Sequence, residues 1–158
     1  MGRGYGLKGL LKSFLYALNG IKYMIFEERN FRIHITAIFF VLYFSVLYGL
    51  SSSQYAVLVL ILSLVPALEL INTAIEKTVD IKTKEFDENA KISKDASAGA
   101  VLVLSIGAVG IAVALFSDLE KLKTAMFTIM SLPHLPILIV AVILAVYFIF
   151  FFGKKRDK

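Results

Sequence analysis

The sequence predicts an all-α membrane protein with several transmembrane helices. Apolar residues make up 58% of the 158 positions, only 18% are charged, and the mean hydropathy is +0.78. These values lie outside the range of soluble globular domains. The apolar residues also gather in runs of about 20, which is the length that crosses a hydrocarbon core of about 30 Å as a helix.

The first predicted element, residues 7–26, is an amphipathic surface helix. Apolar side chains recur at spacings of three and four, and Lys8, Lys12 and Lys22 lie between them. A helix with this pattern lies in the membrane interface and buries one face. The lysines and the lack of a small-residue cleavage pattern also argue against a cleavable signal peptide.

Three longer apolar segments predict the core transmembrane helices: residues 31–50, 55–79 and 96–116. Pro66 lies inside the second segment and predicts a kink. The third segment opens with the small residues Ala96-Ser97-Ala98-Gly99-Ala100, which favour close approach of another helix. We therefore expect residues 1–118 to form one membrane domain.

Residues 119–158 are expected to extend this domain, with a fourth span over residues 135–152 and a basic tail, Lys154–Lys158. With four spans and both termini in the cytoplasm, all Lys and Arg residues except Lys121 and Lys123 fall on the cytoplasmic side, as the positive-inside rule requires. The basic residues flank apolar runs instead of forming one patch, so no nucleic-acid partner is expected. The chain has no Cys, which excludes disulfides, thiolate metal sites and a cysteine nucleophile.

The most informative polar residues lie at the end of the second span. At about 100° per residue, Glu69, Asn72, Glu76 and Asp80 share an arc of about 80° on one helix. Ionisable groups in a spanning helix are costly unless a partner, a metal or water compensates for their desolvation. The alternatives to a reactive site are a polar zipper between helices and, for Asp80, a charge paired with a lysine at the helix end.

Two more polar clusters meet this face at the same membrane surface. Glu28 precedes the first span, and Lys94 and Asp95 precede the third. Carboxylates from different helices suit Mg²⁺, which prefers oxygen ligands and keeps waters or phosphate oxygens in its other positions. A lysine can hold phosphate charge, and a deeper carboxylate can accept a proton from a lipid hydroxyl. The phosphate-binding motifs of soluble kinases and P-loop enzymes are absent from the sequence.

These residues resemble the prokaryotic diacylglycerol kinase and undecaprenol kinase family of small membrane lipid kinases. The similar stretches are Glu28-Arg29-Asn30-Phe31-Arg32, Glu69-Leu70-Ile71-Asn72-Thr73-Ala74-Ile75-Glu76 with Asp80, and residues 90–101. The resemblance, which covers about the first 118 residues, implies an ATP- and Mg²⁺-dependent kinase in the bacterial cell membrane. It implies a homotrimer with nucleotide sites near the cytoplasmic face, between neighbouring subunits.

The resemblance also assigns roles to single residues. Glu69 is implied to be the catalytic base and, with Asn72, to contact the lipid substrate. Glu28 and Glu76 are implied to be the metal ligands. The implied contacts to ATP are Tyr16, Glu28, Glu76, Lys94 and Asp95, and Glu85, Phe86 and Asp87 occupy the loop that reaches over the nucleotide in the family.

The expected reaction is transfer of the γ-phosphate of ATP to a primary hydroxyl of a lipid. Residues 30–34 and 94–101 look more like the undecaprenol kinase branch, with diacylglycerol as the alternative substrate. A function of another class is a small ion or proton transporter in which Glu69 and Glu76 line the path. The gathering of the carboxylates at one membrane face speaks against a path across the bilayer.

Overall fold

The computed structural model describes residues 6–82 and 85–153, and the expected basic tail Lys154–Lys158 lies outside them. The described residues form six α-helices and no strand, which confirms the predicted all-α class. The helices are α1 Leu7–Glu27, α2 Arg29–Tyr48, α3 Ser52–Lys82, α4 Glu88–Leu115, α5 Leu119–Met130 and α6 His134–Phe150.

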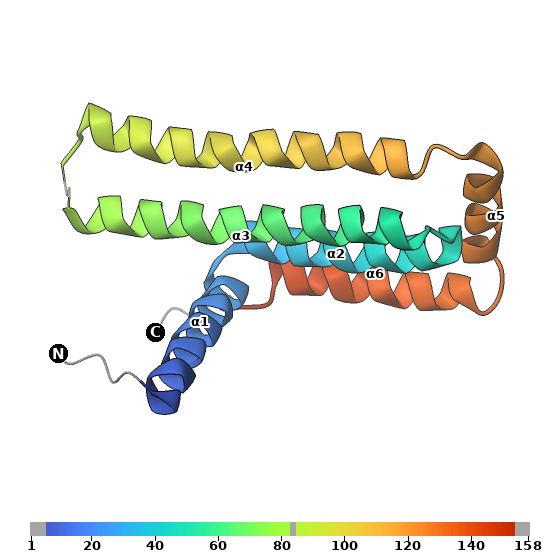
Figure 1. Cartoon of the computed structure of the whole chain (residues 1–158), viewed down its shortest axis with the longest axis horizontal. Coiled ribbons are helices and arrows are strands. Elements are labelled where there is room, and N and C mark those ends of the chain that lie inside the picture. Colours follow the sequence, from blue (N-terminus) through green and yellow to red (C-terminus); the bar gives the residue numbers. More distant parts are fainter. Residues whose placement is uncertain (1–5, 83–84, 154–158) are drawn as a thin grey trace.

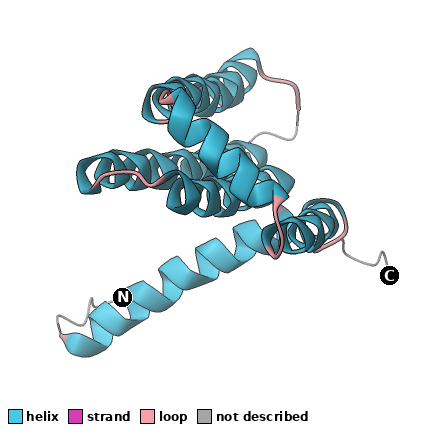
Figure 2. Ribbon diagram, turned by 90° about the vertical axis from the view of Figure 1, so that its right-hand side faces the viewer, coloured by secondary structure: helices cyan, strands magenta, loops and turns pink. Residues whose placement is uncertain are grey.

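The long helices α2, α3, α4 and α6 run alongside one another, while α1 projects from one end of the bundle and α5 crosses the other end (Figure 1). Helix α3 is central, because it packs against α4 on one side and α2 on the other. Helix α6 packs against α2, and among the described helices the backbone of α4 lies close only to that of α3. Viewed from the α5 end, α1 again points away from the bundle (Figure 2).

Helices α2, α3 and α4 are each long and apolar enough to cross a membrane, as predicted. Helix α6 corresponds to the expected fourth span but has only 17 residues. It meets the same criteria only together with α5, from which it is bent by 82°. The chain therefore has three unbroken candidate spans, and a fourth if this bent pair counts as one.

The structure differs from the predicted elements at α4 and α5. Helix α4 starts at Glu88, eight residues before the apolar segment at 96, because Asp87 caps it and accepts a hydrogen bond from Ala90 N at 2.9 Å. Helix α5 forms in a segment for which no element was predicted. Asp118 caps it by accepting hydrogen bonds from the backbone N–H groups of Glu120 and Lys121. In both places a capping carboxylate, and not hydrophobicity, sets the start.

Helix α5 is fastened to the α2–α3 turn at the end of the bundle farthest from α1. Ala125 is completely buried in a cluster with Tyr48, Leu50 and Leu58. Asp118 N donates a hydrogen bond to the Tyr48 hydroxyl at 2.9 Å, and Lys121 Nζ donates to Gly49 O at 3.4 Å. The C-terminal extension is thus part of the packed structure.

We predict that Ala125→Leu destabilises the protein by about 1–3 kcal/mol, because a larger side chain has no room in this filled cluster. Thermal unfolding in detergent micelles measures the effect. Thr124→Leu, at the exposed neighbouring position of the same helix, is the matched control and should leave the unfolding temperature nearly unchanged. Equal effects of the two substitutions would contradict the packing of α5.

Candidate active site

The polar residues of α3 lie on one face, and their exposure rises toward the end of the helix. Glu69 is only 4% exposed and Asn72 only 7%, while Glu76 is half-buried and Asp80 is exposed. We call these four residues the acidic face. The buried end of this face is at Glu69, next to the apolar part of the helix, and the open end leads to the loop before α4. This gradient suits a site reached from lipid at one end and from water at the other.

A chain of hydrogen bonds across the α3–α4 contact orients the middle of the acidic face. Ser97 Oγ donates to Asn72 Oδ1 at 2.6 Å, and Asn72 Nδ2 donates to Glu76 Oε1 at 3.1 Å. Ser97 is itself buried. In the sequence it appears only as one of several small residues, and the one signal of its role is its place three positions after Lys94, on the same side of α4.

The junction of α1 and α2 brings a third carboxylate toward the acidic face. Glu28 has an extended backbone between the two helices, and its carboxylate lies 3.9 Å from Lys77 Nζ of α3. The Asn30 side chain hydrogen-bonds Glu69, and the charges of Glu28 and Glu76 also act on Glu69. The structure therefore brings Glu28, Glu69 and Glu76 into one electrostatic neighbourhood, as the sequence predicted for a single membrane surface.

Lys94 pairs with Asp80 at the open end of the acidic face. Lys94 Nζ lies 2.6 Å from Asp80 Oδ1, and both side chains are partly exposed. This pair confirms the interpretation of Asp80 as a lysine-paired charge. An exposed ion pair contributes only about 0–1 kcal/mol, so a phosphate group can readily displace Asp80 from Lys94. Asp95, the next residue, is exposed beside it.

Tyr16 and the loop before α4, both expected near the nucleotide, have other surroundings in the single chain. Tyr16 is 71% exposed on α1, three turns before Glu28, and is not brought to the acidic face. In the loop, Phe86 is exposed and Asp87 caps α4. Asp87 thus has a structural role that explains its presence without a ligand.

The carboxylates fit Mg²⁺ by type but do not make a complete protein cage. Within the described residues, no group of three or more Asp, Glu or His side chains is close enough to hold a metal ion. Glu28 and Glu76 offer oxygen ligands, and Mg²⁺ is commonly bound through one or two carboxylates with phosphate oxygens and waters in the remaining positions. The Glu28 and Glu76 carboxylates therefore suit a Mg²⁺ ion that binds together with the phosphates of a nucleotide.

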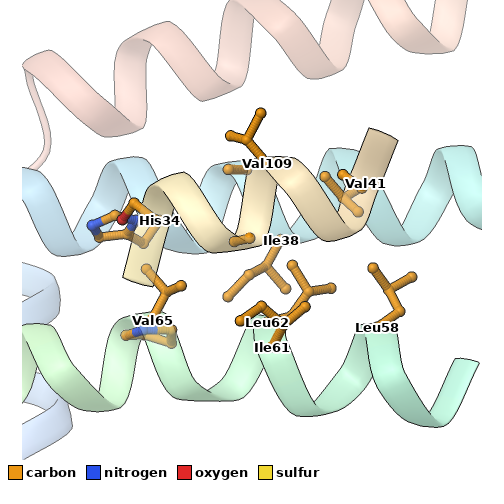
Figure 3. Close-up of a pocket in the computed structure, with 13 residues that line it drawn as sticks. His34, Ile38, Val41, Leu58, Ile61, Leu62, Val65 and Val109 are labelled. Atoms are coloured by element: carbon orange, nitrogen blue, oxygen red, sulfur yellow. The ribbon is translucent and has the colours of Figure 1, made fainter. Parts of the chain in front are cut away.

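An apolar cavity of about 240 Å³ lies between α2, α3 and α4. His34 and Val65 are at one end of it, and Val41 and Leu58 are at the other (Figure 3). Val65 precedes Glu69 by one helical turn, so the cavity and the buried carboxylate share a face of α3. Apart from His34 and Ser105, the lining is apolar, which suits a hydrocarbon chain.

Known proteins similar to this chain act on lipids. A family model described as prokaryotic diacylglycerol kinase matches residues 15–116. The chain is 46% identical over 101 residues to a diacylglycerol kinase from Synechocystis sp., which covers 63% of this chain but only 58% of the relative. It is 41% identical over 100 residues to an undecaprenol kinase from Bacillus subtilis, covering 63% of this chain and 81% of the relative.

A diacylglycerol kinase from Helicobacter pylori is 37% identical over 99 residues, covering 62% of this chain and 77% of the relative. No solved structure matches the chain. The relatives thus carry two substrate names, and the family match ends at residue 116, before α5 and α6.

We predict that Ser97→Ala lowers the free energy of unfolding by about 1–3 kcal/mol, because the buried Asn72 Oδ1 loses its hydrogen-bond donor. Chemical unfolding in detergent micelles measures the change. Ser93→Ala, one turn earlier on the same helix and exposed, is the control. A loss as large for Ser93→Ala would mean that the Ser97 hydroxyl has no special role.

Proposed function

This chain belongs to the prokaryotic diacylglycerol kinase family, and we propose on that premise that it transfers the γ-phosphate of ATP to a primary hydroxyl of a membrane lipid. The observation that carries the proposal is the position of Glu69. This carboxylate is buried, has Asn30 as a hydrogen-bond partner, and follows an apolar cavity by one helical turn. A lipid whose chain occupies that cavity would present its hydroxyl to a general base.

Undecaprenol is our first candidate for the lipid, and diacylglycerol is the alternative. Residues 30–34 and 94–101 support undecaprenol, while the similar proteins include kinases named for each lipid. Both are lipids with a primary hydroxyl that can lie at the membrane interface. The same base and the same nucleotide site would serve either one.

In the proposed reaction, Glu69 accepts the proton of the lipid hydroxyl as its oxygen attacks the γ-phosphorus. The new O–P bond forms as the bond from the γ-phosphorus to the bridging oxygen breaks, and ADP leaves. Asn30 would hold the base, and Asn72, one turn after Glu69 and bonded to Glu76, would orient the hydroxyl. Positioning and fixed charges supply most of the acceleration in reactions of this type.

Glu28 and Glu76 would hold the Mg²⁺ that accompanies ATP, and this metal when bound neutralises charge on the phosphates. The Ser97–Asn72–Glu76 hydrogen bonds keep the Glu76 carboxylate turned toward the site. Lys94 would leave Asp80 to bind phosphate oxygens, with Asp95 beside it contacting the nucleotide. Tyr16 would reach a nucleotide only from the surface helix of another copy.

The assembly that we propose is a homotrimer with its sites at the cytoplasmic face. Two observations support it: among the described helices the backbone of α4 lies close only to α3, and the Tyr16 side chain is exposed on α1, three turns before Glu28. A neighbouring subunit would cover α4 and bring a Tyr16 to the site. The cytoplasmic side is supported by the distribution of the basic residues, and ATP is available there.

The test of the function is phosphate transfer from labelled ATP by the purified protein in mixed micelles, with undecaprenol and diacylglycerol offered side by side. Faster labelling of undecaprenol supports our first candidate, and faster labelling of diacylglycerol supports the alternative. If neither lipid is labelled above the Glu69→Gln background, the kinase proposal is wrong. Ion flux without ATP consumption would then support a transporter.

We predict that Glu69→Gln lowers kcat by about 10²- to 10⁴-fold and leaves ATP affinity nearly unchanged, because the base is lost but the nucleotide site is not. Glu76→Gln should instead raise the KM for Mg-ATP by about tenfold or more, the effect of losing a charged contact worth about 1.5–3 kcal/mol. Steady-state kinetics and equilibrium nucleotide binding separate the two. If Glu69→Gln instead weakened Mg-ATP binding and Glu76→Gln lowered kcat, the roles assigned to the two residues would have to be exchanged.

We also predict that Ala108→Phe raises the KM for the lipid and leaves the KM for ATP unchanged, because the added ring fills the apolar cavity. Val103→Phe, at an exposed position of the same helix that does not line the cavity, is the matched control. Varying lipid and ATP separately in the micelle assay measures both constants. An unchanged lipid KM would place the hydrocarbon chain elsewhere.

A further inference from the structure

Two helix ends meet at the junction of α1 and α2, and Arg32 lies between them. Its guanidinium Nη1 donates to the carbonyls of Ile25 and Phe26 in the last turn of α1, at 3.1 Å each. Its Nε donates to the carbonyl of Ile149 in the last turn of α6, at 3.3 Å. Arg32 is only 6% exposed, and among the described residues no carboxylate pairs with it.

This arrangement satisfies a buried cation without an acidic partner. The last carbonyls of a helix lack partners within the helix and carry the negative end of its dipole. Arg32 therefore binds the negative ends of α1 and α6 together. Breaking one side of this link would leave a buried charge partly unpaired, which is costly.

The end of α6 makes two further contacts with the same turn of α1. The rings of Phe152 and Phe26 are 5.0 Å apart between centroids. Gly153 has φ of 76°, and a Cβ added to it would overlap the backbone carbonyl of Phe26. The approach of the two backbones thus requires glycine for its conformation and for its lack of a side chain. In Figure 1 the end of α6 reaches the base of α1.

Glu28 follows the α1 turn that Arg32 holds, two residues after Phe26. Its N–H donates to Met24 O at 3.0 Å, and its own carbonyl accepts from the backbone N–H of Arg32 at 3.3 Å, which is the first hydrogen bond of α2. The backbone of Glu28 is therefore fixed by the last turn of α1 on one side and by the first turn of α2 on the other, and the Arg32 side chain holds the preceding turn through Ile25 and Phe26. Its carboxylate points to the site through the contact with Lys77.

We propose that Arg32 and the end of α6 form a brace that positions Glu28 for Mg-ATP, so that the C-terminal helix sets the affinity of the nucleotide site. We define the brace as Arg32, Ile149, Phe152 and Gly153. The inference rests on the proposed function, since it gives Glu28 the role of a ligand. It joins the part of the chain matched by the family model to α6, which lies beyond residue 116.

The test is Gly153→Ala in the full-length protein, because this change pushes α6 away from Phe26 without touching a ligand. We expect the KM for Mg-ATP and the Mg²⁺ concentration for half-maximal rate to rise about three- to tenfold, since small displacements of a ligand are costly. The KM for the lipid should stay within about twofold. Gly110→Ala on α4, where the added methyl group meets open space, is the matched control and should change none of these constants.

A binding measurement without turnover accompanies the kinetics. Mn²⁺, titrated against the protein with a non-hydrolysable ATP analogue and followed by electron paramagnetic resonance, should bind more weakly to Gly153→Ala by a similar factor. Arg32→Lys keeps the charge but cannot bridge three carbonyls, so it should weaken Mn²⁺ binding less than Arg32→Gln does. Combined with Arg32→Gln, Gly153→Ala should add little, because both changes break the same link.

The brace is refuted if the wild type transfers phosphate and Gly153→Ala alters only thermal stability, with Mg²⁺ and ATP dependence unchanged. Full additivity of the Arg32 and Gly153 effects would also refute it. If Gly153→Ala does not fold, Phe152→Leu, which removes the ring contact with Phe26 and keeps an apolar side chain, is judged by the same criteria. A wild type that neither transfers phosphate nor binds Mn²⁺ with nucleotide would overturn the proposed function and the brace with it.

Discussion

The structure depends on one constraint, which is that polar groups on a helix buried in a lipid-facing bundle must find partners there. Glu69 and Asn72 are buried on α3 and obtain theirs from two other helices, Asn30 from α2 and Ser97 from α4. Within the described residues, no buried side-chain nitrogen or oxygen lacks a partner. The hydrogen bonds of the polar site therefore also fix how α2, α3 and α4 are aligned along one another.

Residues 118–153 hold α2 at both of its ends. At one end Tyr48 bonds the backbone at Asp118, and at the other Arg32 bonds the last turn of α6. Between them, the Tyr43 hydroxyl lies 2.8 Å from His134 Nδ1 at the start of α6. These three hydrogen bonds attach the segment from Asp118 to the end of α6 to one face of α2. The other face of α2 packs against α3.

The surface helix and the three core spans were predictable from sequence because apolar periodicity and run length report them directly. The acidic face was predictable for a related reason, because residues three or four positions apart in a helix lie on the same face. The early start of α4 was not predicted, because hydrophobicity gives no information about a helix that continues past the apolar layer. There the capping carboxylate of Asp87 is the only local signal.

The roles of Ser97 and Arg32 were harder to predict, since each depends on a helix distant in sequence. Ser97 differs from its small neighbours only because Asn72 faces it across the α3–α4 contact. Arg32 was recognised as part of a motif, but its bond to Ile149 spans 117 positions. Tyr16 could not be assigned a contact within one chain, as its side chain is exposed on α1. Long-range packing leaves no periodic trace in the sequence.

Helix α3 runs without a break over 31 residues, with Pro66 inside it. At 1.5 Å per residue it is about 46 Å long, roughly 15 Å more than the hydrocarbon core of a bilayer. A helix of this length extends beyond the hydrocarbon layer unless it is tilted, and Glu76 lies about 10 Å farther along its axis than Glu69. Glu69, which a membrane lipid would reach, and Glu76, which a water-soluble nucleotide would reach, thus lie on the same helix. The helical rise fixes the distance between them.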